Sequence, residues 1–374
     1  MSATLPIRRE ARVSTPMPIP APSVAHEVPP AALRVSVIIK ALNEERHIAA
    51  SIESALRAIR AVGGEVILAD SGSSDRTVEI ARGYPISIVQ LKNTEERRCG
   101  IGPQLGYQHA RGDFVYILDG DMELDVEFLP QALQLMDADT RLGGIGGVVE
   151  EDSEASYQFR GRKRRAKEAA PRNCEWLDMG GLYRRLALQD VEYFSNRNLH
   201  AYEEMELGLR LCAAGWTLRR IDARGVTHHG RTESTWPLLV RRWRSRYLDG
   251  AGELLRASVG RPYFYRAAQT QQHLFVGLAL WAALIASLVL LPQSPWPLVA
   301  VLAAFGVLIA ARTRRAGNLA DAILGQVVWQ VTSLAMLRGL FSRPRRPTDP
   351  VDYVVLSEPS RTRATKGHSS QPPL

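Results

Sequence analysis

Short hydrophobic runs alternate with helical patterns from residue 34 to about residue 150. Apolar residues recur at helical spacing over 44–61 and 125–136, and a short helix is expected from Arg76. Between these segments, β-branched and aliphatic runs predict buried strands at 35–39, 66–69, 86–91, 114–118 and 145–149. Strands that alternate with helices predict an α/β domain, built on a mostly parallel sheet with flanking helices and right-handed crossovers.

The hydrophobic pattern changes in the last third of the chain. Leu274–Leu291 and Trp296–Ala311 carry no charge, and a proline-rich turn separates them. Each run is close to the minimum length for crossing about 30 Å of hydrocarbon at about 1.5 Å per residue. We therefore expect C-terminal α-helical membrane segments, although a hydrophobic helical core would leave a similar pattern. Arginines flank the hairpin on both sides, which predicts that both of its ends face the cytoplasm.

The remaining segments complete the expected domain organisation. Residues 319–341 are apolar but interrupted by charged and amide side chains, so an interfacial helix is expected there. Residues 1–33 are rich in proline, and residues 342–374 are rich in Arg, Pro and Ser. Both are expected to be disordered. This leaves 34–262 as the globular domain and 263–341 as the membrane-associated part.

Composition narrows the functional classes. The chain has 374 residues, of which 45% are hydrophobic and 23% charged, and a formal net charge of +8. Its three cysteines are too few for a disulfide framework or a cysteine-based zinc site. The positive charge favours partners that carry phosphate, including anionic membrane lipids. The basic run at 160–172 lacks interleaved aromatic residues, so nucleic acid is not expected as a partner; a loop over a diphosphate, or a plain solvated charge run, is expected instead.

Polar side chains follow three of the predicted strands, and two carboxylates stand out among them. Asp119 and Asp121 are separated by a glycine directly after the strand at 114–118. Ligands bind beyond the carboxyl ends of parallel strands, and such a carboxylate pair can hold Mg²⁺ or Mn²⁺ together with substrate phosphates. A phosphohydrolase of the haloacid dehalogenase type, with Asp119 as nucleophile, uses a similar motif. Against it, Glu123 is unusual for that family, and Asp119 follows the fourth strand instead of the first.

Four motifs follow one another along the chain, and their order matters more than any one of them. They are IIKALNEERHI, ILADSGSSDRT, FVYILDGDMEL and HAYEEMELGLRLCAAGW. This ordered set resembles the family 2 inverting glycosyltransferases, which have the Rossmann-like GT-A fold, and the resemblance covers about residues 34–250. For the donor, it implies that Asn43 and Glu44 line the nucleotide pocket. It also implies that Asp70 accepts hydrogen bonds from the base or ribose, and that Asp119 lies near the ribose and phosphates.

The resemblance also implies roles in metal binding and catalysis. Asp121 matches the metal ligand of the family, and His228 or His229 matches a histidine that completes the metal shell, with His228 preferred. Glu203 and Glu204 match the acidic pair of the family, and Glu204 takes the place of the general base. A carboxylate suits this role because the acceptor hydroxyl must lose its proton during attack, while a divalent cation neutralises the leaving diphosphate.

Some positions depart from the family pattern. Lys40 stands where proline is frequent, and Leu42 where an aromatic residue often stacks on the base. Arg241-Arg242-Trp243 resembles part of the QxxRW segment of processive synthases, but Leu239 replaces the glutamine. A processive synthase is therefore not favoured.

The sequence thus predicts a membrane-associated, metal-dependent glycosyltransferase at the cytoplasmic face of the inner membrane. It would move a sugar from a nucleotide-diphosphate sugar to a hydroxyl of a lipid-linked or glycan acceptor. The phosphohydrolase described above remains an alternative. So does a non-catalytic, membrane-tethered protein that binds nucleotide sugars.

Overall fold

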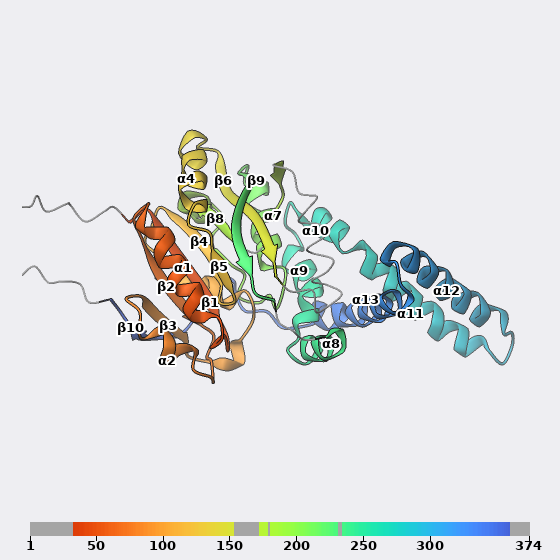
Figure 1. Ribbon diagram of the computed structural model, residues 1–374. Coiled ribbons are helices and arrows are strands. Elements are labelled where there is room, and N and C mark those ends of the chain that lie inside the picture. Colours follow the sequence, from red (N-terminus) through yellow and green to blue (C-terminus); the bar gives the residue numbers. More distant parts are fainter. Residues whose placement is uncertain (1–32, 153–171, 179, 231–233, 360–374) are drawn as a thin grey trace, which may run out of the picture. The chain divides into compact units, whose positions relative to one another are not determined.

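A computed structural model describes residues 33–152, 172–178, 180–230 and 234–359 (Figure 1). The expected proline-rich arm at 1–33 and the basic run at 160–172 fall almost entirely outside these ranges, as does the end of the chain after residue 359.

The centre of the sheet is parallel, as the alternating pattern predicts. Strand order is β3-β2-β1-β4, and every neighbouring pair in this part runs in the same direction. Register aligns the ends of the strands: Ala41 pairs with Asp70, and Lys40 pairs with Asp119. The polar residues that follow these strands therefore meet at one edge. The strands are β1 (Val35–Ala41), β2 (Gly64–Asp70), β3 (Ser87–Leu91) and β4 (Phe114–Asp119).

Beyond β4 the sheet becomes mixed. β8 runs antiparallel to both β4 and β6, whereas β6 and β9 are parallel. β5 is antiparallel to β9, and Met122 pairs with His228, so the strand that follows Asp121 lies beside the histidine pair. These strands are β5 (Met122–Leu124), β6 (Leu142–Glu151), β7 (Arg172–Cys174), β8 (Gly181–Arg184) and β9 (Thr217–His228).

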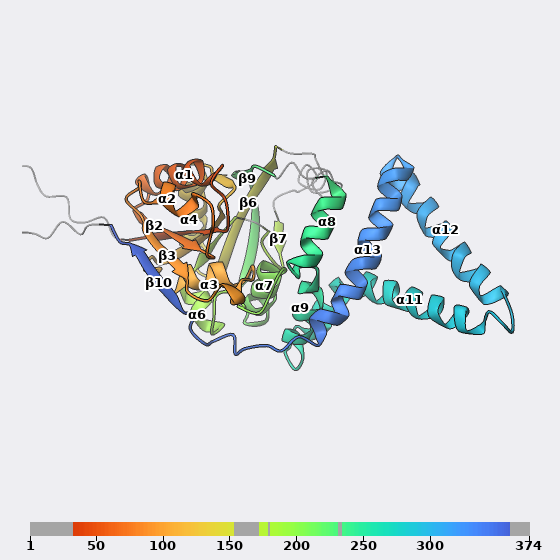
Figure 2. The same ribbon diagram turned by 90° about the horizontal axis from the view of Figure 1, so that it is seen from below.

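Helices cover both faces of the sheet (Figure 2). Alternate residues of β1 face opposite ways: Val37 belongs to the core beneath α1, α2 and α4, and Ile38 to the core beneath α3, α6 and α7. The elements are α1 (Ile48–Arg60), α2 (Thr77–Ala81), η1 (Thr94–Glu96), α3 (Ile101–Tyr107), α4 (Phe128–Ala138), α6 (Arg185–Asp190) and α7 (Glu203–Ala213). A sheet enclosed in this way explains why its central strands read as continuous hydrophobic runs.

The last third of the chain is helical. Three of its helices, α11, α12 and α13, are long and apolar enough to cross a membrane. They differ in burial, because 44% of the apolar window of α13 is buried inside the protein, against 17% for α11 and 0% for α12. The elements are α8 (Thr235–Arg244), η2 (Tyr247–Asp249), α9 (Gly250–Ser258), α10 (Phe264–Thr270), α11 (Gln272–Leu290), α12 (Trp296–Ala316) and α13 (Leu319–Leu340).

One expectation is wrong for the described part of the tail, because residues 342–359 are not disordered. β10 (Tyr353–Ser357) joins the catalytic sheet as an antiparallel partner of β3. Gln108 fixes the approach to β10, since its side chain both donates to and accepts from the backbone of Val351, at 3.1 and 2.7 Å. The overall composition of the tail, rich in Arg, Pro and Ser, led to the expectation of disorder. The tail nevertheless contains a short segment rich in β-branched residues, YVVLS, that can pair with the open edge of β3.

Candidate active site

The ammonium group of Lys40 is the centre of the site. Its Nζ lies 3.1 Å from Asp119 Oδ1, 3.0 Å from Glu203 Oε1 and 3.2 Å from Glu204 Oε1. Burial opposes the charge of this ammonium, but the three carboxylates outweigh burial and hold the pKa of Lys40 well above its usual value. Lys40 therefore stays protonated and joins carboxylates that are more than 80 residues apart in the sequence.

A glycine on α3 makes room for this lysine. A Cβ atom on Gly102 would lie 2.9 Å from Cβ of Lys40, which is closer than real Cβ atoms approach. The side chain of Lys40 passes this helix before it reaches the carboxylates. Gly102 is therefore part of the arrangement that positions the charge.

The first turn of α7 presents the acidic pair. Tyr202 precedes the helix with a φ of 69°, and Glu203 and Glu204 follow it directly. The side chain of Glu203 is 7% exposed and that of Glu204 is 21% exposed. Burial, together with the neighbouring Glu204, raises the pKa of Glu203 to about 7 in spite of Lys40. The less buried Glu204 is the better placed of the two to meet a substrate.

A buried network fixes the start of α7. The carboxylate of Glu206 is fully buried and accepts hydrogen bonds from Arg210 Nε at 2.9 Å and from the hydroxyl of Tyr193 at 2.8 Å. Arg210 in turn donates to the backbone carbonyls of Val191, Tyr193 and Phe194. This network ties the helix to the preceding loop, and so it holds the two glutamates in position. Sequence reasoning missed both Glu206 and Arg210.

Asp121 and His228 face one another across β5 and β9. His228 Nε2 lies 3.5 Å from Asp121 Oδ2, and its Nδ1 lies 2.7 Å from Glu151 Oε2. Burial opposes protonation of this imidazole, but hydrogen bonds to the two carboxylates raise its pKa to about 9. Both ring nitrogens of His229 are engaged elsewhere, by Asp152 and Glu123. The geometry therefore favours His228 over His229 as the partner of Asp121.

The chemistry of this pair fits a divalent cation once the imidazole of His228 gives up its Nε2 proton, because a histidine that binds a metal is neutral. A carboxylate oxygen and an imidazole nitrogen face each other, and the other ring nitrogen is bound by a carboxylate, which is the usual support for a histidine ligand. Among the described residues, no group of three or more His, Cys, Asp or Glu side chains could hold a metal alone. A site of this kind depends on substrate phosphates for its remaining ligands, as magnesium sites often do.

The predicted donor residues lie at the same edge of the sheet, but two of them are engaged within the chain. Asp70 is fully buried and accepts hydrogen bonds from the backbone of Gly72 and Ser73, at 2.9 Å each. The side chain of Asn43 accepts from the backbone of Ser74 at 2.8 Å. Both residues therefore shape the loop after β2, and their contact with a donor stays a prediction. Glu44 lies against Gly120, between the two aspartates.

Charged groups from two acidic segments, the loop of Asp121 and the start of α7, act on Asp119. Burial raises its pKa, Lys40 lowers it, and both Asp121 and Glu204 raise it further. Asp119 thus interacts electrostatically with its own loop and with α7. From the sequence alone, only the order of the motifs indicated that these residues belong to one site.

Comparison with known proteins supports the family resemblance that the motifs carry. The family described as "Glycosyl transferase family 2" matches residues 36–196. This part of the chain therefore matches the family that the motifs predict. The match contains Lys40, Asp119 and Asp121, and it ends before Glu203. Neither the phosphohydrolase nor the non-catalytic alternative receives support from any comparison.

Curated relatives resemble parts of the chain. An undecaprenyl-phosphate 4-deoxy-4-formamido-L-arabinose transferase of Edwardsiella ictaluri is 30% identical over 139 residues, covering 35% of this chain and 41% of the relative. A dolichol-phosphate mannosyltransferase of Pyrococcus furiosus is 26% identical over 127 residues, covering 32% and 36%. The chain therefore spans less than half the length of these relatives.

The fold has a solved counterpart. A mannosyltransferase from Pyrobaculum calidifontis, solved in complex with GDP-Man and Mn²⁺, superposes with a TM-score of 0.55 at 20% identity, over 82% of this chain and 87% of that one. This similarity confirms the GT-A fold that the motifs predict.

Lys40→Met tests the centre of the site. The substitution leaves three carboxylates close together without their cation, and breaking a buried ion pair costs on the order of 3–5 kcal/mol. We expect a lower unfolding temperature than that of the wild type, with a larger loss at pH 8 than at pH 5, because protonation of Glu203 relieves part of the repulsion. The matched control is Lys92→Met, which removes an exposed lysine. Equal unfolding temperatures for the two variants at both pH values would contradict the assignment.

Glu203→Gln tests the raised pKa. The folded-state pKa of Glu203 is about 7, above its usual 4.5, so its contribution to stability is complete below pH 4.5 and is lost as the pH rises through 7. Glutamine has no such dependence. The unfolding temperature of the variant, relative to the wild type, should therefore rise between pH 5 and pH 8, by roughly 2–4 °C for each kcal/mol. Glu127→Gln, at an exposed position, should show no such rise; a flat difference for Glu203→Gln as well would refute the shift.

Proposed function

We propose that the protein is a membrane-bound inverting glycosyltransferase. Its donor is a nucleotide-diphosphate sugar, and its acceptor is a hydroxyl group on a lipid-linked glycan or lipid. The observation that carries the proposal is the convergence of Asp119, Glu203 and Glu204 on Lys40, next to the Asp121–His228 pair. The named activities of the lipid-phosphate sugar transferases among the relatives support this class of reaction.

The residues at the carboxyl ends of β1, β2 and β4 bind the donor in this proposal. Asn43, Glu44 and the loop shaped by Asp70 form the side on which the nucleotide binds, and Asp119 lies toward its ribose and phosphates. Asp121 and His228 would hold Mg²⁺ or Mn²⁺, which when bound neutralises charge on the leaving diphosphate. The structural neighbour from Pyrobaculum calidifontis was solved with GDP-Man and Mn²⁺, which is consistent with this role.

Glu204 acts on the acceptor. Its carboxylate is partly exposed, and it takes the proton of the attacking hydroxyl at a carboxylate oxygen. Lys40 forms an ion pair with this base at 3.2 Å and so fixes the position of its carboxylate. Glu203 carries a proton for part of the time near neutral pH, which limits the negative charge that the site must hold. Attack by one activated hydroxyl, opposite to the leaving group, inverts the anomeric centre.

The sheet restricts how the chain crosses a membrane. β10 follows the three apolar helices and pairs with β3, which precedes them. The two ends of the helical segment must therefore lie on the same side of the membrane. An even number of helices must therefore cross. We assign the crossing to α11 and α12, because α13 is the most buried of the three and Arg338 near its end bonds to the buried Asp249 at 2.6 Å. α13 then lies along the membrane surface, and the catalytic domain is cytoplasmic.

Labelling of single cysteines tests this topology. In a chain whose native cysteines are replaced by serine, Gln293→Cys lies in the turn between α11 and α12, and Arg315→Cys lies at the end of α12. An impermeant thiol reagent added to intact cells should label only Gln293→Cys. The same reagent added to inverted membrane vesicles should label Arg315→Cys together with a reference, Lys92→Cys in the catalytic domain. Labelling of Arg315→Cys from outside intact cells would overturn the assignment.

Transfer assays test the function. Purified protein is incubated with membranes, Mg²⁺ or Mn²⁺, and labelled UDP-, GDP- and dTDP-sugars, and label is measured in the lipid extract. Once a donor is found, Asp121→Asn and Glu204→Gln should each lower the rate at least about 100-fold, since a positioned base contributes roughly 10²–10⁴. Glu127→Gln should be fully active. Full activity in both site variants would refute the residue roles, and no transfer from any donor would refute the function.

A further inference from the structure

A cleft rich in arginine lies beside the candidate active site. It has a volume of about 250 Å³, whereas one water needs roughly 15 Å³. We call it the arginine cleft and define it by Arg98, Arg246, Arg256 and Arg343. The other lining residues are Asn198, His200, Glu253 and Ser342. The family match ends at residue 196, so three of the four arginines lie outside it.

The positive charges of this cleft are only partly matched: Arg246 pairs with Asp249 at 3.0 Å and Arg256 donates to the carbonyl of Gly339 at 2.8 Å, but the other two guanidinium groups are not paired within the described residues. Glu253 is its only acidic lining residue in the described part of the chain, and its carboxylate is bound by His200, through the backbone N–H at 2.9 Å and Nδ1 at 2.8 Å. Within the described residues, the guanidinium groups of Arg98 and Arg343 make no hydrogen bond or ion pair, and Nε of Arg256 is buried without an acceptor. An anion in the cleft would supply the missing acceptors.

Electrostatics within the cleft agree with this imbalance. Burial lowers the pKa of Arg98, and Arg246 lowers it further despite Glu253. Burial also lowers the pKa of Arg256, on which Arg98 and Arg246 again act in the same direction. These guanidinium groups therefore repel one another at close range, and a bound anion relieves that repulsion.

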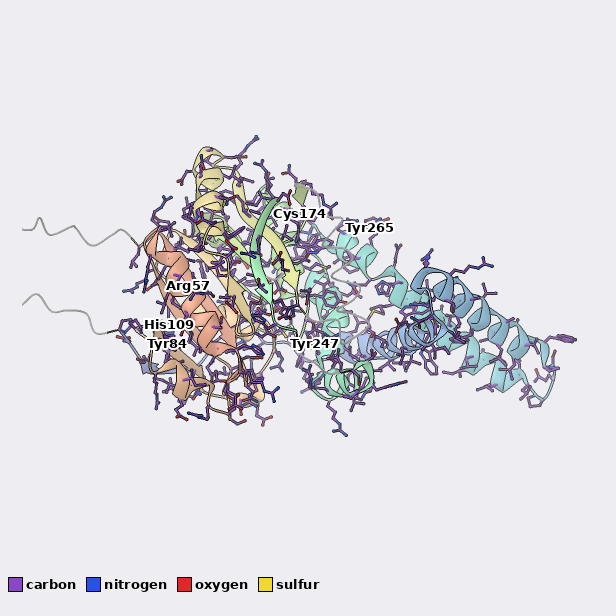
Figure 3. All side chains as sticks on the ribbon, in the orientation of Figure 1. Arg57, Tyr84, His109, Cys174, Tyr247 and Tyr265 are labelled. Atoms are coloured by element: carbon purple, nitrogen blue, oxygen red, sulfur yellow. The ribbon has the colours of Figure 1, made fainter. Side chains whose placement is uncertain are left out.

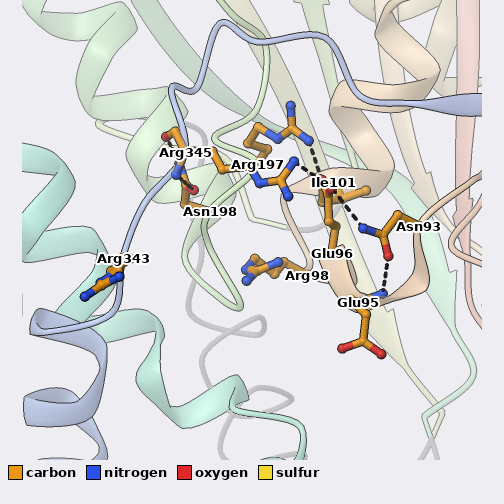
Figure 4. A pocket seen from close by; sticks show the side chains of 9 residues that line it. All are labelled: Asn93, Glu95, Glu96, Arg98, Ile101, Arg197, Asn198, Arg343 and Arg345. Carbon is orange, nitrogen blue, oxygen red and sulfur yellow. Dashed lines mark hydrogen bonds and ion pairs between the residues drawn. The ribbon is translucent and has the colours of Figure 1, made fainter.

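A neighbouring pocket shows what a balanced arrangement looks like (Figure 4). There Glu96 forms ion pairs with both Arg197 and Arg345, the latter at 2.7 Å. Arg98 and Arg343 line this pocket too, but Figure 4 draws no interaction between either side chain and the other residues shown. The guanidinium groups without an acidic partner are therefore those of Arg98 and Arg343, which line both pockets.

The position of the arginine cleft suggests what the anion is attached to. Cys99, next to Arg98, interacts electrostatically with Glu203 and Lys40. Tyr247, which follows Arg246 and is labelled in Figure 3, interacts electrostatically with Glu203 and Glu204. On its other side, Arg343 follows the end of the apolar helix α13 by three residues. The cleft thus lies between the catalytic carboxylates and the part of the chain expected at the membrane.

We propose that the arginine cleft binds the phosphate or diphosphate group of a lipid-linked acceptor. This inference rests on the proposed function and deepens it, because it names the part of the acceptor that the protein recognises. Guanidinium groups match phosphate oxygens through paired hydrogen bonds, and several arginines around one group give both affinity and orientation. A phosphate held here places the adjoining part of the acceptor next to Glu204, while its lipid extends toward α13.

Calorimetric binding tests this without requiring turnover. Purified full-length protein in neutral detergent is titrated with farnesyl phosphate, and in parallel with farnesol, inorganic phosphate and UDP. Arg98→Gln and Arg343→Gln should each weaken farnesyl phosphate about tenfold or more, since a hydrogen bond to a charged group contributes roughly 1.5–3 kcal/mol. Binding of UDP should not change, and farnesol should bind equally weakly to all variants. The matched control is Arg346→Gln, an exposed arginine of the same segment outside both pockets.

Each outcome decides the matter. Unchanged farnesyl phosphate affinity in both variants overturns the proposal, and Arg343 is exposed, so its replacement should leave the fold intact. A parallel loss of UDP affinity assigns the cleft to the donor and also overturns it. Equal competition by phosphatidylglycerol vesicles would mean a general lipid contact, again against the proposal. Asp121→Asn should bind farnesyl phosphate normally while losing transfer, which separates failure of the cleft from failure of the proposed function.

Discussion

The ammonium group of Lys40 lies within 3.2 Å of three carboxylates that come from two distant segments of the chain. At such distances, carboxylates without a cation repel one another strongly in a partly buried site. The register of β1 with β4 places Lys40 beside Asp119, and the Glu206–Arg210 network holds α7 so that its glutamates meet the same charge. The candidate chemistry of Asp121, His228 and Glu204 depends on this arrangement.

The same sheet couples the site to the membrane-associated helices. β10 returns the chain to the edge of the sheet after three apolar helices, and Asp249 connects η2 to α13 through Arg338. The segment between α13 and β10 carries Arg343, which contributes to the arginine cleft, and Arg345, which pairs with Glu96. This tail thus joins the edge of the sheet to the arginine cleft.

Much of the catalytic half could be predicted from the sequence, because buried parallel strands leave continuous apolar runs and polar residues gather where they end. Asp119, Asp121, Glu203, Glu204 and His228 were predicted as site residues from the order of their motifs. Lys40 was noticed only as an unusual residue, since one lysine in an apolar strand does not reveal which carboxylates it meets. The strand at 353–357 was missed because its partner β3 is far away in the sequence. Glu206 and Arg210 were missed because a charge pair four residues apart on a helix does not by itself reveal that it is buried.

The central claim is that Lys40 and the acidic pair act as one unit, and a double-mutant cycle on stability measures this directly. Unfolding free energies are compared for the wild type, Lys40→Met, Glu203→Gln and the double variant at pH 8, where Glu203 is mostly ionised. We predict that the double variant is more stable than the sum of the single effects by roughly 0.5–3 kcal/mol, as for residues in direct contact. Additivity within about 0.3 kcal/mol would contradict the account.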